Sequence, residues 1–181
     1  TGVRGIKLAS KDNVVSMAVN HHVDVTSEER AAYFKMRRAI TGDETGENTE
    51  TTSTLSQERY AELSAMEEWI LAITASGFGK RSSAHEYRVS GRGGQGIAAA
   101  NLTRRDDKIV ASFTVEEEDQ IMLVTSAGQS IRCPVQGISR QGRSSSGVKV
   151  FDTSDQEEVV SVAWIAEQNQ DEDEPDEKNE V

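Results

Sequence analysis

The chain has 181 residues, of which 35% are hydrophobic and 28% charged, with a net charge of -11 and one cysteine. The single cysteine excludes an internal disulfide framework and a cysteine-based zinc site. No apolar run approaches the ~20 residues of a membrane-spanning helix. So low a hydrophobic content predicts that part of the chain is linker, insertion or tail. We expect a cytoplasmic protein without a membrane partner. The first residues start inside a pattern that recurs later, which predicts a segment of a larger protein.

Charge is spread unevenly along the chain. Residues 1–68 carry 8 basic and 12 acidic residues, residues 69–150 carry 11 and 7, and residues 151–181 carry 1 and 12. A basic middle beside an acidic end is typical of a polyanion-binding surface with an acidic tail. The alternative is a tail that only solubilises a neutral domain.

Residues 1–20 are predicted to be the end of a repeating unit that recurs twice further along the chain. Gly2 and Val14–Val15 occupy the positions of Gly147 and Val159–Val160 in the last copy. The run between them is short and strand-like, so we expect it to close one unit of a repeat array.

Residues 21–68 interrupt the repeat and are predicted to form a helical insertion around an acidic, disordered link. The stretch TSEERAAYFKMRRAI begins with Thr26 and has Glu29 three residues on, which is the spacing of a capping box. In this helix Ala32, Met36 and Ile40 fall on one face, with Ala39 beside them. The stretch SQERYAELSAMEEWI predicts a second helix capped by Ser56, and the acidic run GDETGENTETTST separates the two.

Residues 69–118 and 119–168 are two copies of one unit, related by an offset of 51 positions. In each copy an apolar run, ILAIT or IMLVT, leads through a glycine turn at Gly77 or Gly128 into an outer strand. The runs IVASFTV and VVSVAWI are again strand-like. A period near 50 residues with four short strands is typical of a propeller blade. We therefore predict an all-β fold with a helical insertion, in which 169–181 is a disordered acidic tail.

The stretch GRGGQG at 91–96 matches the G-x-G-x-x-G fingerprint of a dinucleotide-binding turn. That fingerprint needs a helix after its last glycine and an acidic residue about 20 positions on. The equivalent positions of the other copies carry VKVFDT and VRGIKL, which are strand-like, and Gly93 corresponds to Ser144. The pattern that recurs is Gly-Arg-x-x-x-Gly-aliphatic, a basic loop that leads into a strand, so a nucleotide-binding enzyme is disfavoured.

These motifs, taken in order, resemble the C-terminal domain of DNA gyrase A. The resemblance rests on T-x-x-G-x-x-[KR]-R, the Arg-x-x-x-Gly loop and V-V-x-[SG], and it covers residues 1–20 and 69–168. It implies a β-pinwheel of propeller-like four-stranded blades that exchange a strand, and a non-catalytic module that wraps double-stranded DNA during ATP-dependent negative supercoiling. Two features depart from the family: the box Q-R-R-G-G-K-G is absent, and residues 21–68 have no counterpart. The related A protein of topoisomerase IV, and a propeller that scaffolds protein partners, remain the alternatives.

A wrapping module holds DNA by its phosphates, and arginine suits this because its planar fork pairs two phosphate oxygens. The predicted DNA-binding residues lie on the outer strands and the glycine loops. They are Lys80, Arg81, Arg88, Arg92, Gly93, Gly94, Arg132, Arg140 and Arg143, with Arg4, Lys7, Arg104, Arg105 and Lys149 less central.

No catalytic residue is predicted in this chain. His21, His22 and His85 lack a metal-ligand or triad setting, and Cys133 is interpreted as a small apolar residue. By resemblance, ATP and Mg²⁺ belong to the holoenzyme. The implied partners are DNA, gyrase B and the rest of gyrase A in a heterotetramer on the bacterial nucleoid.

Overall fold

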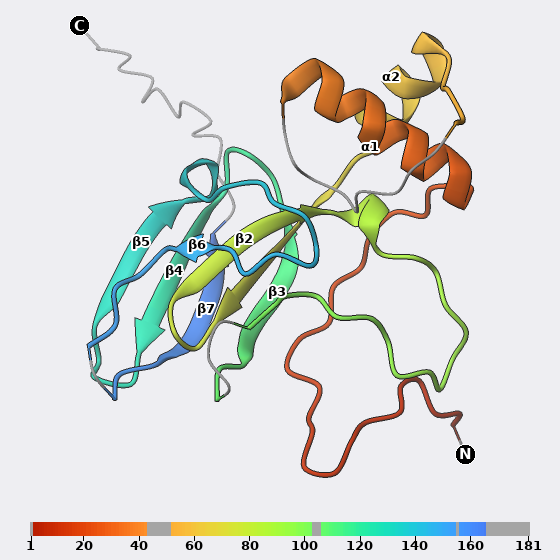
Figure 1. The fold of residues 1–181 in the computed structure, drawn as a ribbon. Coiled ribbons are helices and arrows are strands. Elements are labelled where there is room, and N and C mark those ends of the chain that lie inside the picture. Colours follow the sequence, from red (N-terminus) through yellow and green to blue (C-terminus); the bar gives the residue numbers. More distant parts are fainter. Residues whose placement is uncertain (1, 43–51, 103–105, 155, 166–181) are drawn as a thin grey trace, which may run out of the picture.

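The computed structural model describes residues 2–42, 52–102, 106–154 and 156–165 (Figure 1). Two helices and two antiparallel sheets make up the regular structure of these residues. Their bounds are α1 Ser27–Thr41, α2 Gln57–Ala65, β1 Trp69–Thr74, β2 Phe78–Ser83, β3 Ile109–Val115, β4 Gln120–Thr125, β5 Ser130–Pro134, β6 Val148–Lys149 and β7 Val159–Ile165. Two short 3-10 helices, η1 Ala84–Glu86 and η2 Val135–Gly137, follow β2 and β5. The predicted acidic tail and most of the acidic link lie outside the described residues.

The two repeats fold into the same three-stranded unit. In the first unit β1 pairs with β2 and β3, and in the second β4 pairs with β5 and β7. The register shifts at equivalent points, between Ile73 and Thr74 in one unit and between Val124 and Thr125 in the other. The strands predicted for the apolar runs and for the outer strands of both copies are therefore confirmed.

A glycine in the left-handed region closes each hairpin. Gly77 has φ +80° and Gly128 has φ +83°, and each donates its N–H to the threonine carbonyl three residues before it. An L-residue with a side chain adopts this backbone conformation only with strain, which is why glycine stands at both turns.

One short strand joins the two units. β6 belongs to the second repeat but pairs with β2 of the first, so the sheet orders are β3-β1-β2-β6 and β5-β4-β7. Gly147, which precedes β6, lies so close to Gly79 that a Cβ there would come within 2.6 Å of the Gly79 carbonyl oxygen. The first sheet thus has four strands and the second has three among the described residues.

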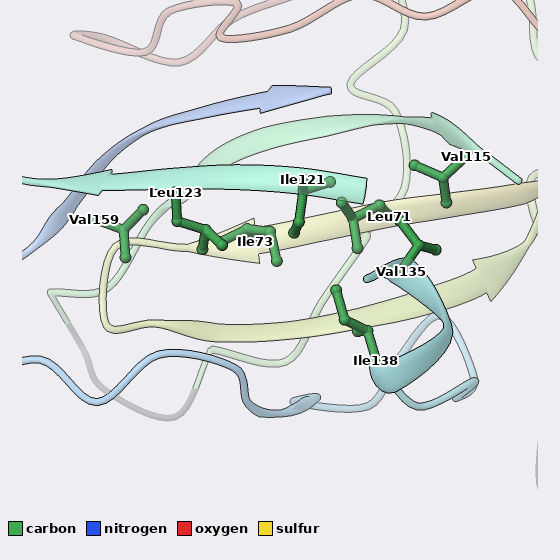
Figure 2. Close-up of a cluster of buried hydrophobic side chains, with 8 residues drawn as sticks. All are labelled: Leu71, Ile73, Val115, Ile121, Leu123, Val135, Ile138 and Val159. Atoms are coloured by element: carbon green, nitrogen blue, oxygen red, sulfur yellow. The ribbon is translucent and has the colours of Figure 1, made fainter. Parts of the chain in front are cut away.

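The main core lies between the two sheets (Figure 2). Leu71 and Ile73 of β1 face Ile121 and Leu123 of β4, and all four are fully buried. Val115, Val135, Ile138 and Val159 complete the cluster. Burial stabilises each such side chain by about 1.5–3 kcal/mol, so the two units stabilise one another through a shared core.

The insertion folds into α1 and α2, as predicted, and both predicted N-caps are confirmed. Thr26 and Glu29 form a complete capping box, and Ser56 caps α2. On the predicted apolar face of α1, Ala32 is buried and Met36 half-buried, whereas Ile40 is 60% exposed. The face that packs is centred on Tyr33 and Phe34, which meet Leu63 of α2.

Hydrogen bonds and aromatic contacts attach the insertion to the first unit. His85 Nε2 lies 2.9 Å from the Leu63 carbonyl oxygen, and the Tyr33 ring meets the His85 ring edge-on at 5.4 Å. The Tyr33 hydroxyl donates to Glu67 at 3.1 Å. α1 therefore turns Tyr33, rather than Ile40, toward the rest of the molecule.

Two segments predicted to contain strands are irregular. Residues 97–102 form neither a helix nor a strand, so the prediction that Gly96 starts a strand is wrong. In residues 2–20 the regular pairing is one isolated bridge between Ile6 and Gly94. The apolar side chains there are exposed, for example Met17 at 87%. Figure 1 draws both segments as irregular traces without a helix or an arrow. Among the described helices none is long and apolar enough to cross a membrane.

Candidate nucleic-acid interface

A buried lysine organises the glycine loop of the second repeat. Lys80 on β2 is 1% exposed, and its Nζ donates to the carbonyl oxygens of Gly142 at 2.9 Å and Ser145 at 2.8 Å, and also to that of Arg143. Burial lowers the pKa of Lys80 to about 8, against the influence of the nearby Glu86 carboxylate. The ammonium of Lys80 therefore holds the loop backbone and is not displayed at the surface.

The same loop is also held by a group of the opposite charge. Glu86, at the end of η1, accepts a hydrogen bond from the Arg143 backbone N–H at 2.6 Å. A cation thus binds the loop carbonyls while a carboxylate binds a loop amide, which fixes the backbone of residues 142–145 against the first unit. Ser145 extends this attachment, because its carbonyl accepts from Asn101 N at 3.0 Å.

Arg81 is the second predicted site residue that the structure buries. It is 3% exposed, and its guanidinium donates to the carbonyl of Ile138 at 2.7 Å and to Glu117 at 2.6 Å. Glu117 also accepts from Arg140 Nη2 at 2.7 Å. Burial alone would raise the pKa of Glu117, but its hydrogen bonds to the two arginines lower it. One carboxylate therefore brings Arg81 and Arg140 together.

Trp69 lies between two guanidinium groups from different parts of the chain. Arg140 Cζ lies 4.6 Å from the ring centroid and Arg37 Cζ of α1 lies 4.7 Å from it. Arg37 is itself paired with Glu67, and both side chains are 6% exposed. Cation–π contacts of this geometry contribute about 0.5–2 kcal/mol. Trp69 thus links the insertion, the first unit and the second unit.

Other predicted arginines are exposed on β5 and on the segment after η1. Arg132 on β5 donates to Gln120 Oε1 at 2.6 Å, while Arg88 and Arg92 have no partner among the residues that the structure describes. The GRGGQG loop that carries Arg92 is held by its backbone, since Gly93 N donates to Gly5 O at 2.7 Å and Gly94 O accepts from Lys7 N at 2.8 Å. Arg92 is therefore available to an external anion.

The remaining predicted residues fall into three groups. Arg143 is half-buried and bonds the Ala98 carbonyl, and Lys149 Nζ pairs with Asp152 at 2.6 Å. Arg4 and Lys7 are exposed on the N-terminal segment, and Arg104 and Arg105 lie outside the described residues.

The structure brings Lys80, Arg81, Arg140 and Arg143 into one region around β2. It places Arg88 and Arg92 on the segment that follows η1. Sequence reasoning missed three residues that hold this region, Trp69, Glu86 and Glu117. An acidic residue such as Glu117 in the run EEED gives no sequence signal for a partner more than 20 positions away.

The histidines form no metal cluster among the described residues. His21 Nδ1 lies 2.7 Å from Glu68 Oε1, and His85 bonds the Leu63 carbonyl.

Comparison with known proteins identifies the family of this chain. The family model described as "DNA gyrase C-terminal domain, beta-propeller" matches residues 1–21, 68–116 and 119–163. The chain belongs to this family. The gaps in the match leave out most of the helical insertion.

Curated relatives of the chain are DNA gyrase A proteins. Gyrase A of Granulibacter bethesdensis is 46% identical over 92% of this chain and 20% of its own length, and that of Rickettsia felis is 40% identical over 94% and 19%. The chain thus spans about a fifth of the length of these gyrase proteins.

Two solved structures share the fold over 55% of the chain. A DNA gyrase A C-terminal domain superposes with a TM-score of 0.50 at 24% identity, over 34% of that chain. The C-terminal domain of DNA topoisomerase IV superposes with a TM-score of 0.51 at 22% identity, over 30% of that chain. The likeness to both supports the gyrase-type fold and does not separate the two enzymes.

Proposed function

We propose that this chain is a DNA-wrapping part of DNA gyrase A and supports negative supercoiling without catalysing a step itself. The observation that carries the proposal is the pair of Arg-x-x-x-Gly loops, each fixed through its backbone. Arg92 is exposed on one of them, and Arg132 is exposed on β5. Rigidly held, exposed guanidiniums suit a DNA backbone that is bound through phosphates and bent, because no base has to be read.

The finer architecture that we propose is a β-pinwheel. The supporting observation is β6, which comes from the second repeat and completes the sheet of the first. Residues 69–118 and 119–168 would then be two blades, 1–20 the end of a preceding blade, 21–68 an insertion and 169–181 an acidic tail. Exposed apolar residues such as Met17 and Trp164 fit surfaces against which further blades pack.

The proposed contact set changes once burial is considered. We assign direct phosphate contacts to Arg88, Arg92, Arg132, Arg140 and Lys149, and backbone contacts to Gly93 and Gly94. Lys80 and Arg81 instead support the loop and strand that carry Arg140 and Arg143. ATP, Mg²⁺, gyrase B and the rest of gyrase A belong to the proposed holoenzyme, and no residue of this chain is assigned to the cofactors.

Gyrase is preferred to topoisomerase IV as the parent enzyme. The curated relatives described above are gyrase A proteins with up to 46% identity, whereas the likeness to topoisomerase IV is one of fold. A Q-R-R-G-G-K-G box upstream of this chain in the full protein would decide between them.

The test is the salt dependence of duplex DNA binding by the full-length protein. Replacing Arg92 and Arg132 together by Gln is expected to reduce the slope of log K against log[salt] by about 1.8, since each phosphate contact contributes about 0.9. The control is Lys108→Gln. Lys108 pairs with Glu158, and Asp107 and Glu157 lie close by, so these acidic surroundings do not suit a DNA phosphate. A double variant with the parental slope and affinity would refute the assignment.

A further inference from the structure

A cavity of about 510 Å³ lies where the helical insertion meets the first unit. The segment 20–25, the first turn of α1 and the residues just after η1 form its walls. Arg30 from α1 and Arg88 from the segment after η1 both line it. The cavity is therefore built partly by the insertion and partly by the chain that leads to the GRGGQG loop.

The two arginines of the cavity lack ion-pair partners, unlike other arginines of the insertion. Arg37 pairs with Glu67, and Arg59 pairs with Glu29 and Glu62. The Nε of Arg30 is buried and has no hydrogen-bond partner, and Arg30 and Arg88 form no ion pair with any described residue. The buried Nε of Arg30 has lost water without gaining a partner, which is costly. Arg88 is exposed at the same cavity, so both guanidiniums can bind an external ligand there.

The carboxylates of the cavity do not neutralise these arginines. Both oxygens of Glu68 are used by His21, whose backbone N–H donates at 2.9 Å and whose Nδ1 lies at 2.7 Å. Asp24 also lines the cavity and is exposed. His22 and His85 add further nitrogen atoms to the walls. Arg30 and Arg88 thus carry the unpaired positive charge of the cavity, whereas Asp24 leaves one exposed carboxylate at its wall.

We propose that this cavity binds a phosphate group. Guanidinium forks pair with phosphate oxygens through two parallel hydrogen bonds, and a phosphate offers enough oxygens for both arginines. Arg88 lies four positions before Arg92 in the chain, so one short segment connects the cavity to the GRGGQG loop. The assignment of the phosphate to DNA rests on the proposed function, and it makes the helical insertion part of the DNA-binding track. A free phosphate or a small phosphorylated ligand has the same chemistry.

The test compares Arg30→Gln, Arg88→Gln and the control Lys35→Gln in the full-length protein. Lys35 is exposed on α1, lies about 140° around the helix from Arg30 and is absent from the cavity walls. One arm measures duplex DNA binding across a salt series, and the second measures inorganic phosphate and pyrophosphate binding by calorimetry. Circular dichroism and thermal unfolding check that each variant is folded.

For a DNA phosphate, each cavity variant should bind DNA about tenfold more weakly with a salt slope lower by about 0.9, while Lys35→Gln keeps the parental slope. If the cavity variants weaken only inorganic phosphate or pyrophosphate binding, the phosphate site stands and its ligand is a free one. If folded cavity variants match the parent in both arms, the site is refuted. A parent protein that binds no DNA would refute the proposed function, and the phosphate arm would still decide the cavity.

Discussion

Lys80 shows at the level of one residue how a predicted DNA contact becomes a structural one. Its ammonium is buried beneath a loop from the second repeat, and the carbonyl of Gly142, 62 positions further along the chain, is one of its acceptors. The repeat pattern predicts correctly that Lys80 lies on an outer strand with a basic neighbour. The repeat pattern does not predict that Lys80 is buried, because the loop that covers it belongs to the next repeat and not to the local sequence.

Replacing Lys80 by Met tests this structural role. The variant leaves loop carbonyls without a donor, so we expect the free energy of unfolding to fall by about 2–3 kcal/mol in chemical denaturation. The control is Lys149→Met, which removes an exposed ion pair and should change stability by less than about 1 kcal/mol. Equal, small effects of the two substitutions would show that Lys80 does not hold the loop.

The pKa of Lys80 gives a second residue-scale prediction. Burial lowers this pKa from 10.5 to about 8, so between these values the unfolded chain binds the proton and the folded chain releases it. The unfolding free energy of the parent relative to Lys80→Met should therefore rise by about 2 kcal/mol between pH 7.5 and 9.5. The check is denaturant unfolding of both proteins at the two pH values, and a constant difference would contradict the burial of a charged amine.

At the scale of elements, the hairpins and helix caps can be predicted from local sequence, whereas the strand pairing between the two repeats cannot. The repeat of apolar runs and glycine turns predicted β1 to β5 and β7 nearly residue by residue. β6 has two residues and depends on β2 for its pairing, so it has no pattern of its own. Residues 97–102 are strand-like only by analogy with the second repeat. Among the described residues no strand pairs with them, and Asn101 N instead donates to the Ser145 carbonyl.

The apolar spacing of α1 identifies its packing face only in part, for a related reason. Helical spacing of apolar residues favoured Met36 and Ile40, but α1 packs through Tyr33 and Arg37, whose polar ends reach Glu67. An aromatic hydroxyl and a guanidinium count as polar in any hydrophobic pattern. They nevertheless form the contact here because a buried carboxylate satisfies both.

The two hairpin glycines offer a matched test of how the units join. Both have left-handed backbone, but a Cβ on Gly77 would lie 2.2 Å from the Phe151 carbonyl oxygen, whereas a Cβ on Gly128 meets nothing within 4 Å. Each Ala substitution carries the cost of positive φ, about 1–2 kcal/mol. We expect Gly77→Ala to be clearly more destabilising than Gly128→Ala, because it also displaces the chain next to β6. Equal losses in thermal unfolding would mean that the units do not pack as described.

At the scale of the whole molecule, two repeated sheets share one core and a helical insertion is attached to the first of them. Trp69 and Glu117 connect these parts through Arg37, Arg81 and Arg140. Residues 69–150, the basic middle of the chain, make up most of these two units. We infer that the pair of units presents its exposed arginines as one rigid surface, which is the property that a DNA-bending protein needs.

The measurement that tests DNA wrapping most directly is the linking number of nicked plasmid ligated in the presence of the full-length protein. If the protein wraps DNA, the mean linking number of the ligated circles should shift, and the shift should grow with the ratio of protein to DNA. The double variant Arg92→Gln, Arg132→Gln should give a smaller shift at equal concentration. Ligated circles with the linking number of the protein-free control, under conditions where the protein binds the plasmid, would contradict DNA wrapping.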